Sequence, residues 1–480
     1  MFRTCSAVRL WTREEILWRA ANEPEPLADE FLVLQRRLHD LEIRAAQNST
    51  NSGKPPSSDG PGKPAPKSQR ERGTRARGGQ RGHLGRTLQP VTEPDVIITH
   101  ALECCPCGCG CSLRDEPVLD HAVRQVFELP PQKLVVTEHR AEVKCCPGSG
   151  REVRAPFPPG VDAPAQYGQR FHSWLAYLRV AQLMPLRRIR QMADDLFAQP
   201  VSEATVERAV QTINDALPPF ESALVDALKR SPVLHADESG LRVDSQLYWL
   251  HVLCSDRLTW YGVHARRGSA ALEDFGILKD FSGRLVHDCM QSYFLLPCTH
   301  SLCNSHLLRE LTFLHEELAE QWAADMKALL LEMFVQRGRW SSSQIVSIPE
   351  QITAFHARYQ ILLTQGYLEQ PPPVRTGKRG RPKRTKAHNL LDRLRQYQAS
   401  VLAFLRDPSI PFTNNQAEQD LRMLKVQQKI SGCFRTLEAA RTFARIRAYV
   451  STVRKHGLDI LTALRDALAG VPFCPSYSGP

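Results

Sequence analysis

The chain has 480 residues, 42% of them hydrophobic, with a formal net charge of +11 and an isoelectric point near 9.1. At roughly 150 residues per domain, this length predicts about three folded domains. The excess of basic residues favours a polyanionic partner, most often nucleic acid. No apolar run reaches the roughly 18 residues of a membrane span, and the opening MFRTCSAVRLWTREE has charges where a signal peptide needs an apolar core. We therefore expect a cytoplasmic protein with no membrane segment.

A short amphipathic helix is predicted at residues 28–46. Phe31, Leu34, Leu38 and Leu41 follow one another at steps of three, four and three residues, which is the spacing of a heptad seam about two turns long. Such a seam is typical of a leucine-zipper-like contact between helices. It indicates that the chain associates with copies of itself.

Residues 47–94 are dominated by Ser, Gly, Pro, Lys and Arg, a composition that cannot bury a core and predicts a flexible basic linker. Cysteines then cluster at positions 104–111 and 145–146, with strand-like runs such as QKLVVTEHRAEVKCC between them. Fourteen cysteines in a chain of this length are not a disulfide framework, and their clustering favours a metal. We expect a small metal-stapled module at residues 95–161.

Residues 162–231 read as helical. The stretch LRRIRQMADDLFAQPVSEATVERAVQTI predicts a helix, a turn at Gln199 and Pro200, and a second helix capped by Ser202. This pattern resembles a helix-turn-helix. An ordinary helical hairpin fits it equally well, because the pattern specifies two packed helices and nothing about a DNA groove.

Beyond residue 232 the pattern becomes rich in β-strands. The runs VLHADESGLRV, SQLYWLHVLCS and LTWYGVHARRG predict three strands, which the helical SAALEDFGILKDF and a fourth strand, GRLVHDC, follow. Together they predict a mixed sheet in an α/β layer. A helical insertion is expected at about 307–410, and it contains a second basic linker, PPPVRTGKRGRPKRTKAHN.

The stretch PFTNNQAEQDLRMLKVQQKISG predicts a helix with an acid at its head and bases behind it. Asn414 or Asn415 is a suitable N-cap, so the helix should begin near Gln416. One face presents an apolar stripe, and another carries, in order, Glu418, Arg422, Lys425 and Lys429. A solvent-exposed Glu–Arg pair would also produce this pattern.

Two further acids lie on the predicted strands. Asp237 should stand on the first strand and Asp288 at the end of the fourth, and neighbouring strands would bring them to one edge of the sheet. With Glu418 they would form a carboxylate cluster of the kind that holds two divalent cations roughly 3.5–4 Å apart for phosphodiester chemistry. Glu238 follows Asp237 on the strand and should point to the opposite face, which disfavours a direct role.

From about residue 30 to residue 470 the chain resembles the insertion-sequence 66 family of bacterial transposases. The matching stretches are NSTNSGKPPSSDG, GGQRGHLG, HADESGLRV, WLHVLCS, VHDCMQSYF, CNSHLLRELTFL, FTNNQAEQDLRMLKVQQKISGCFRT and RKHGLDILTALRDALAG. The resemblance implies a ribonuclease-H-like α/β core at 232–455, interrupted by the helical insertion and followed by a helical tail at 456–480. It also implies a DDE-type catalytic triad of Asp237, Asp288 and Glu418.

For function, the resemblance implies a transposase that uses Mg²⁺ or Mn²⁺ to cut double-stranded DNA at element ends and to join the freed 3′-hydroxyls to target DNA. Arg422, Lys425 and Lys429 would then face DNA phosphates. Accessory proteins of the same element and a nucleoid-associated location are implied as well. The alternatives are a metal-dependent nuclease that does not join strands and a decayed DNA-binding protein. Met290 stands where a large aromatic residue is expected in the family.

Zinc is expected from the same resemblance. Cys104, Cys107, Cys145 and Cys146 resemble the two cysteine pairs of the family's zinc-finger-like domain, in which they would bind one ion tetrahedrally. The second pair departs from the C-x-x-C pattern, because Ser149 stands where its second ligand would be if Cys146 is the first. The site could be completed by Cys109, Cys111, His121 or His139.

Two weaker motifs remain. His300, Cys303 and His306 are spaced by three and resemble part of a zinc site, although a helix start without metal is favoured because no fourth ligand is evident. Arg379 and Arg381 lie in KRGRPKR, which has the core of an AT-hook for the DNA minor groove. A solvated basic loop is the favoured reading of that segment.

Overall fold

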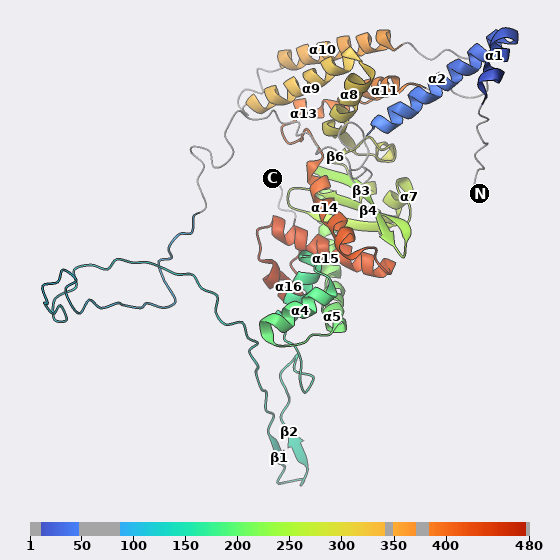
Figure 1. Cartoon of the computed structure of the whole chain (residues 1–480). Helices are drawn as coiled ribbons and strands as arrows, with labels where there is room; N and C mark the ends of the chain where they lie inside the picture. The colour runs from blue at the N-terminus through green and yellow to red at the C-terminus, as the bar shows by residue number, and fades with distance from the viewer. Residues whose placement is uncertain (1–10, 48–86, 341–348, 371–383, 477–480) are drawn as a thin grey trace.

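The computed structural model describes residues 11–47, 87–340, 349–370 and 384–476. Its centre is a five-stranded sheet in the order β5-β4-β3-β6-β7 (Figure 1). The strands are β3 (Val233–Val243), β4 (Gln246–Cys254), β5 (Thr259–His264), β6 (Arg284–His287) and β7 (Thr299–Leu302). The first three pair antiparallel, whereas β6 lies parallel to β3 and β7 parallel to β6. The predicted mixed sheet is therefore confirmed.

A tight turn sets the register of the long β3–β4 hairpin. Asp244 and Ser245 both have positive φ angles, 44° and 62°, and the residues on either side of them, Val243 and Gln246, pair across the strands. Two left-handed residues form the type of turn whose twist matches that of the strands it joins, and Asp and Ser are short enough to enter it. The turn lies at the end of β3 that is remote from its neighbour β6.

One group of helices shares a hydrophobic core with the sheet. Buried side chains of β3, β4 and β5 pack with those of helices that precede and follow the sheet in the sequence. These helices are α3 (Gln169–Ala176), continued by a π-turn at Tyr177–Ala181, α5 (Glu203–Ala216), α6 (Pro218–Arg230), α14 (Asn415–Ser431), α15 (Leu437–Lys455) and α16 (Ile460–Leu468). The helix α4 (Leu186–Phe197) packs beside α3 and α5 over a smaller core. As predicted, Ser202 caps α5, accepting a hydrogen bond from the Thr205 N–H.

A second group of helices has its own core. Trp322, Tyr359 and Leu391 are fully buried there. The group comprises α8 (Asn304–Leu318), α9 (Gln321–Arg339), α10 (Pro349–Glu369), α11 (Lys386–Gln396), α12 (Gln398–Val401) and α13 (Ala403–Arg406). It leaves the sheet after β7 and returns to it at α14, and Figure 1 shows it at the opposite end of the sheet from α4, α5 and α16. The short α7 (Ser269–Phe275) lies between β5 and β6.

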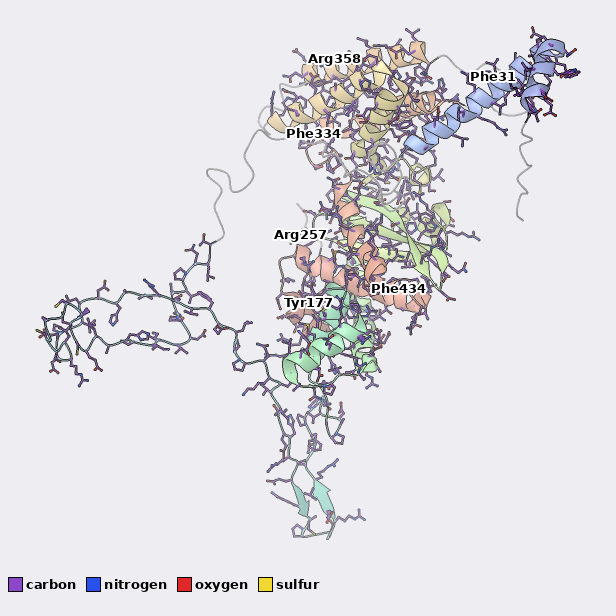
Figure 2. All side chains as sticks on the ribbon, viewed as in Figure 1. Phe31, Tyr177, Arg257, Phe334, Arg358 and Phe434 are labelled. Carbon is purple, nitrogen blue, oxygen red and sulfur yellow. The ribbon has the colours of Figure 1, made fainter. Side chains whose placement is uncertain are left out.

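The N-terminal part carries two helices, α1 (Arg13–Asn22) and α2 (Pro24–Ala46). The seam residues lie on α2 and are exposed, and Figure 2 labels Phe31 among them. The exposed fractions of Phe31, Leu34, Leu38 and Leu41 are 65%, 47%, 59% and 59%. Most of the predicted linker at residues 47–94 lies outside the described residues.

Residues 95–161 have little regular structure. A two-stranded antiparallel sheet of β1 (Val143–Cys145) and β2 (Glu152–Arg154) is their main element (Figure 1). Apolar side chains such as Leu119, Val135 and Val136 are 87–96% exposed, so this segment has no hydrophobic core of its own in the part of the chain that is described. A metal is the usual means by which so small a module is held together.

Candidate active site

Asp237 lies within β3 and Asp288 directly follows β6, just beyond the point where the pairing of these two strands ends. The parallel pairing of β3 with β6 places His235 opposite Val286, two residues before each aspartate. Asp237 accepts a hydrogen bond from the Glu238 N–H at 2.8 Å, and Asp288 accepts one from the Met290 N–H at 3.2 Å. These bonds direct the two carboxylates within one small region at the edge of the sheet.

The two carboxyl groups have raised pKa values. Burial, followed by the charges of Glu238 and Asp288, raises the pKa of Asp237 well above its usual range, and Glu418 adds to the effect. Burial and the charge of Glu238 raise the pKa of Asp288 to about 6, against an opposing contribution from Arg267. The site therefore carries more negative charge than its own cations neutralise.

Glu238 lies next to the two aspartates rather than apart from them. Its side chain is fully buried and accepts hydrogen bonds from the Arg267 Nε at 2.7 Å and from the Tyr293 hydroxyl at 2.8 Å. Arg267 also reaches Asp288, with 3.9 Å between Nη2 and Oδ2. The alternation of side chains along the strand predicted that Glu238 points away from the aspartates. It could not predict that Arg267, from another part of the chain, links Glu238 to Asp288.

The loop that carries Arg267 is held close to the strand end. Gly268 has a φ of 95°, and a Cβ at this position would lie 2.7 Å from the Ser292 Oγ, so only glycine fits. The Arg267 guanidinium also lies 4.9 Å from the ring centroid of Trp249 on β4. The ring and the two acids together fix the position of the guanidinium.

Glu418 enters from α14, which is anchored directly to β3 by Asn414. The Asn414 side chain is buried, donates through Nδ2 to the Ala236 carbonyl at 2.8 Å, and contacts the His235 Nδ1 through Oδ1 at 2.9 Å. Since Oδ1 can only accept, His235 must carry its proton on Nδ1. Asn414 stands at the predicted N-cap position, but its side chain does not cap the helix, because these two bonds occupy it.

A second anchor joins α14 to β5. Asp420 forms an ion pair with Lys455 at 2.8 Å, and each side chain is only 12% exposed. Asp420 also accepts from the Thr259 hydroxyl at 3.3 Å, and its main-chain carbonyl accepts from the Tyr261 hydroxyl at 2.8 Å. The orientation of Glu418 is therefore set by contacts on both sides of it along the helix.

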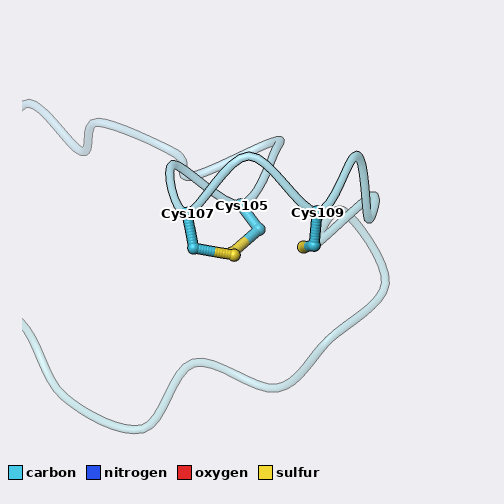
Figure 3. Close-up of side chains that lie close together, drawn as sticks. All are labelled: Cys105, Cys107 and Cys109. Atoms are coloured by element: carbon cyan, nitrogen blue, oxygen red, sulfur yellow. The ribbon is translucent and has the colours of Figure 1, made fainter.

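Two groups of three metal-ligating side chains, with atoms within 4.8 Å of one another, occur in the described part of the chain. One contains Cys303, His306 and Glu418; the other contains Cys105, Cys107 and Cys109 (Figure 3). Asp237, Asp288 and Glu418 are not such a group. In a two-metal site the ions lie roughly 3.5–4 Å apart, and carboxylates that bind different ions can be farther apart than the ligands of a single ion. The larger separation of these three acids is therefore compatible with a two-metal site.

The N-terminal cysteine group differs from the predicted ligand set. The sulfurs of Cys105 and Cys107 are 2.9 Å apart, and hydrogen bonds, first from the Cys111 backbone, lower the pKa of Cys109 to about 6. Of the predicted ligands, the group contains Cys107 and also Cys109, which was expected as a residue that could complete the site. Cys104, Cys145 and Cys146 do not belong to it, and the last two lie at the β1–β2 hairpin.

The cations of α14 are available for a partner. Arg422 and Lys429 are exposed and Lys425 is half-buried. None of the three forms an ion pair with an acid among the residues that the structure describes, so the local Glu418–Arg422 pair of the simpler interpretation is not made. Arg379 and Arg381 lie outside the described residues.

The donor set fits a hard divalent cation. Carboxylate oxygens are the ligands that Mg²⁺ and Mn²⁺ prefer, and a bound cation would stabilise the charged form of Asp237 and Asp288, whose pKa values are raised by burial and by neighbouring acids. A separate cavity of about 370 Å³ is lined by His235, Arg257 and His456, among others, and excludes all three acids. This cavity is therefore not part of the candidate active site.

The sequence did not predict the contacts that Arg267 and Tyr293 make with Glu238, or the bond from Asn414 to β3. It also did not predict that Cys303 lies close to Glu418. The role of Asn414 could have been predicted in part. Two asparagines are adjacent at the helix start and only one is needed as an N-cap, so the side chain of the other is available for a contact elsewhere. Arg267 and Tyr293 had no signal, since each reaches Glu238 from a different part of the chain.

Comparison with known proteins supplies a family. Residues 164–442, more than half of the chain, match the family model described as Transposase IS66 family, and residues 9–89 match one described as a family of unknown function, DUF6444. No curated protein matches. A solved structure, the cryo-EM structure of the simian T-cell lymphotropic virus intasome in complex with PP2A regulatory subunit B56 gamma, is 11% identical with a TM-score of 0.14 and covers 44% of this chain and 80% of that chain. A likeness this weak decides nothing about the fold.

Proposed function

Because the chain belongs to the transposase IS66 family, we propose that it is a DDE-type DNA transposase that cuts DNA at the ends of its element and transfers the freed 3′-hydroxyls into target DNA. The observation that carries the proposal is the placement of Asp237 and Asp288 just beyond the paired residues of the adjacent strands β3 and β6, with the helix of Glu418 bonded to β3 through Asn414. Acids from three distant segments rarely converge in this way without a shared task.

The sheet supports a ribonuclease-H-like core. Three antiparallel strands are followed by a fourth that returns parallel to the first, and the two strands that meet at the centre of the sheet carry Asp237 and Asp288. The helical insertion, α8–α13, begins after Asp288 in the sequence and ends before Glu418. The insertion has a core of its own, and Cys289, next to Asp288, packs against it.

The proposed metal ions are Mg²⁺ or Mn²⁺, held by Asp237, Asp288 and Glu418; when bound, such ions activate an attacking oxygen and stabilise the leaving oxygen of a phosphodiester. The residues of the chain orient this site. Arg267 restrains Glu238 and Asp288 together, which limits the spread of the acids. Arg422, Lys425 and Lys429 continue from Glu418 along α14 and are placed to bind the phosphates of the strand to be cut.

The partners follow from the activity. Element ends and target are both double-stranded DNA, and pairing two ends requires at least two active sites, which is consistent with a homo-oligomer formed through α2. Accessory proteins of the same element and a cytoplasmic, nucleoid-associated location belong to the same proposal. No helix in the described ranges is long and apolar enough to cross a membrane.

The proposal is tested with the full-length protein and a DNA carrying the element ends. Asp237→Asn, Asp288→Asn and Glu418→Gln should each abolish cleavage and joining, by at least about a thousandfold, while end binding is retained. The matched control is Glu273→Gln, an exposed acid on α7, which should leave both reactions unchanged.

Each other outcome has a definite reading. Cleavage without joined product in the wild type would identify a metal-dependent nuclease, and end binding without either reaction would identify a decayed DNA-binding protein. If Glu418→Gln retained strand transfer, the third position of the triad would have to be assigned to another acid.

A further inference from the structure

Cys303 and His306 lie beside Glu418 where the helical insertion begins and ends. Cys303 directly precedes α8 and His306 lies in its first turn, whereas Glu418 lies in the first turn of α14. One ligand atom from each side chain lies within 4.8 Å of the other two. Thiol sulfur, imidazole nitrogen and carboxylate oxygen are the three ligand types that zinc uses in proteins.

The environment of each side chain suits a metal. The His306 Nδ1 is buried and has no hydrogen-bond partner. A neutral imidazole has a lone pair on one ring nitrogen, which it can offer to a metal. An imidazole nitrogen buried without a partner is costly, and a bound cation would supply the missing interaction.

Backbone N–H groups surround the Cys303 sulfur. Its sulfur accepts a hydrogen bond from the Asn414 N–H at 3.1 Å, and the N–H groups of Ser305 and His306 in the first turn of α8 also point toward it. Burial raises the pKa of the thiol to about 11, so a metal would displace the proton on binding. Backbone donors of this kind stabilise the sulfur charge in a metal site.

We propose that Cys303, His306 and Glu418 form a binding site for zinc or a similar thiophilic divalent cation, which joins the two ends of the helical insertion. Ligand atoms around tetrahedral zinc lie roughly 3–4 Å apart at bond lengths of about 2.0–2.3 Å, so small side-chain movements complete the site. The fourth position is left to solvent. The ion closes the long loop formed by α8–α13 and so fixes Glu418 relative to β7.

The proposed zinc site shares Glu418 with the proposed catalytic triad, but it is tested by metal binding in the absence of DNA, so the two proposals can fail separately. The N-terminal cysteines are expected to bind zinc too, so the experiment compares variants of the full-length chain. Purified protein is equilibrated with buffered zinc and its metal content is measured, and the cobalt-substituted protein is examined by absorption spectroscopy. Cys303→Ser is compared with Cys298→Ser, a matched buried cysteine before β7.

Wild type and Cys298→Ser should bind one more zinc per chain than Cys303→Ser. The cobalt difference spectrum between wild type and Cys303→Ser should contain a sulfur-to-cobalt charge-transfer band. Glu418→Gln should keep this band but weaken binding about tenfold or more, because the sulfur remains and only an oxygen ligand is altered. Zinc should also raise the thermal unfolding temperature of wild type more than that of Cys303→Ser.

Equal metal content and identical cobalt spectra in wild type and Cys303→Ser would overturn the proposal. If Cys303→Ser fails to fold by circular dichroism, His306→Ala at its half-buried position provides the same comparison. If the wild-type protein binds this zinc but neither cuts nor joins DNA, the result would contradict the proposed function and leave the zinc site standing.

Discussion

The carboxylates of Glu238 and Asp288 share a single guanidinium, that of Arg267, and the charges of both act on Asp237. Arg267 hydrogen-bonds Glu238 and only approaches Asp288, so the two aspartates remain short of positive charge. Burial is the main reason that their pKa values are raised, and the charges of neighbouring acids add to it. Residues kept in such a state reduce folding stability, and this is common where a site is shaped to receive a cation.

The cost of this arrangement can be measured at Asp288. The folded-state pKa of about 6 lies above the ordinary value of 3.8, so protonation stabilises the fold below pH 4 and that stability is lost as the pH rises through 6. In metal-free protein, Asp288→Asn should therefore raise the free energy of unfolding by about 1–3 kcal/mol at pH 8 and by little at pH 4. Denaturant unfolding with a chelator at both pH values checks this.

The control for that measurement is Asp226→Asn, an exposed acid on α6, which should change the free energy of unfolding by less than about 0.5 kcal/mol. The same small change for Asp288→Asn at pH 8 would show that burial and like charge do not strain the site.

At the scale of elements, α14 combines an anchored start with a free basic face. Asn414 and Asp420 hold it to β3 and β5, and the cations beyond Glu418 make no ion pair in the described structure. Arg422→Gln, Lys425→Gln and Lys429→Gln should each lower the slope of log affinity against log salt for element ends by about one unit. Catalysis should fall further than binding, because a displaced strand no longer meets the carboxylates.

The matched control is Lys327→Gln, on helix α9 of the helical insertion. This substitution should leave the slope of log affinity against log salt unchanged. Unchanged slopes and unchanged joining for the three α14 variants would return these cations to the role of solvated surface charges. Electrophoretic mobility shifts over a range of salt concentrations provide the measurement.

The helix α2 permits a test of self-association. Leu34 and Leu38 lie on the heptad seam and are 47% and 59% exposed, whereas Leu32 is also 47% exposed but lies off the seam. Leu34→Glu and Leu38→Glu should lower the molecular mass measured by sedimentation, because charge on the seam disfavours helix pairing. Leu32→Glu should not, and a mass that responds equally to all three substitutions would argue against the seam.

At the scale of the whole molecule, we expect the segment at residues 95–161 to depend on a bound metal, because it has no hydrophobic core in the part of the chain that is described. Cys105, Cys107 and Cys109 already lie together, and the apolar side chains around them are exposed. Zinc should therefore slow limited proteolysis within this segment, and a chelator should restore rapid cleavage. Replacement of the three cysteines by serine should remove the protection, while cleavage at identical rates with and without zinc would rule out a zinc-stapled module.

Much of the architecture follows from the sequence because its signals are local. Alternation and turn residues predict the strands that carry Asp237 and Asp288, and the apolar stripe with Glu418 predicts α14. The mixed sheet and family membership are confirmed, whereas the catalytic and DNA-binding roles of these residues stay predictions. Local periodicity also explains the correct capping of α5 by Ser202.

Only the tertiary structure decided which side chains accompany these acids. Arg267 and Tyr293 reach Glu238, and Asn414 turns from its helix to β3, through contacts between segments far apart in the chain. No local pattern records such contacts, because they depend on how the sheet, its loops and α14 pack. The proximity of Glu418 to Cys303 and His306 has the same origin: the insertion must fold back on itself before its two ends can meet.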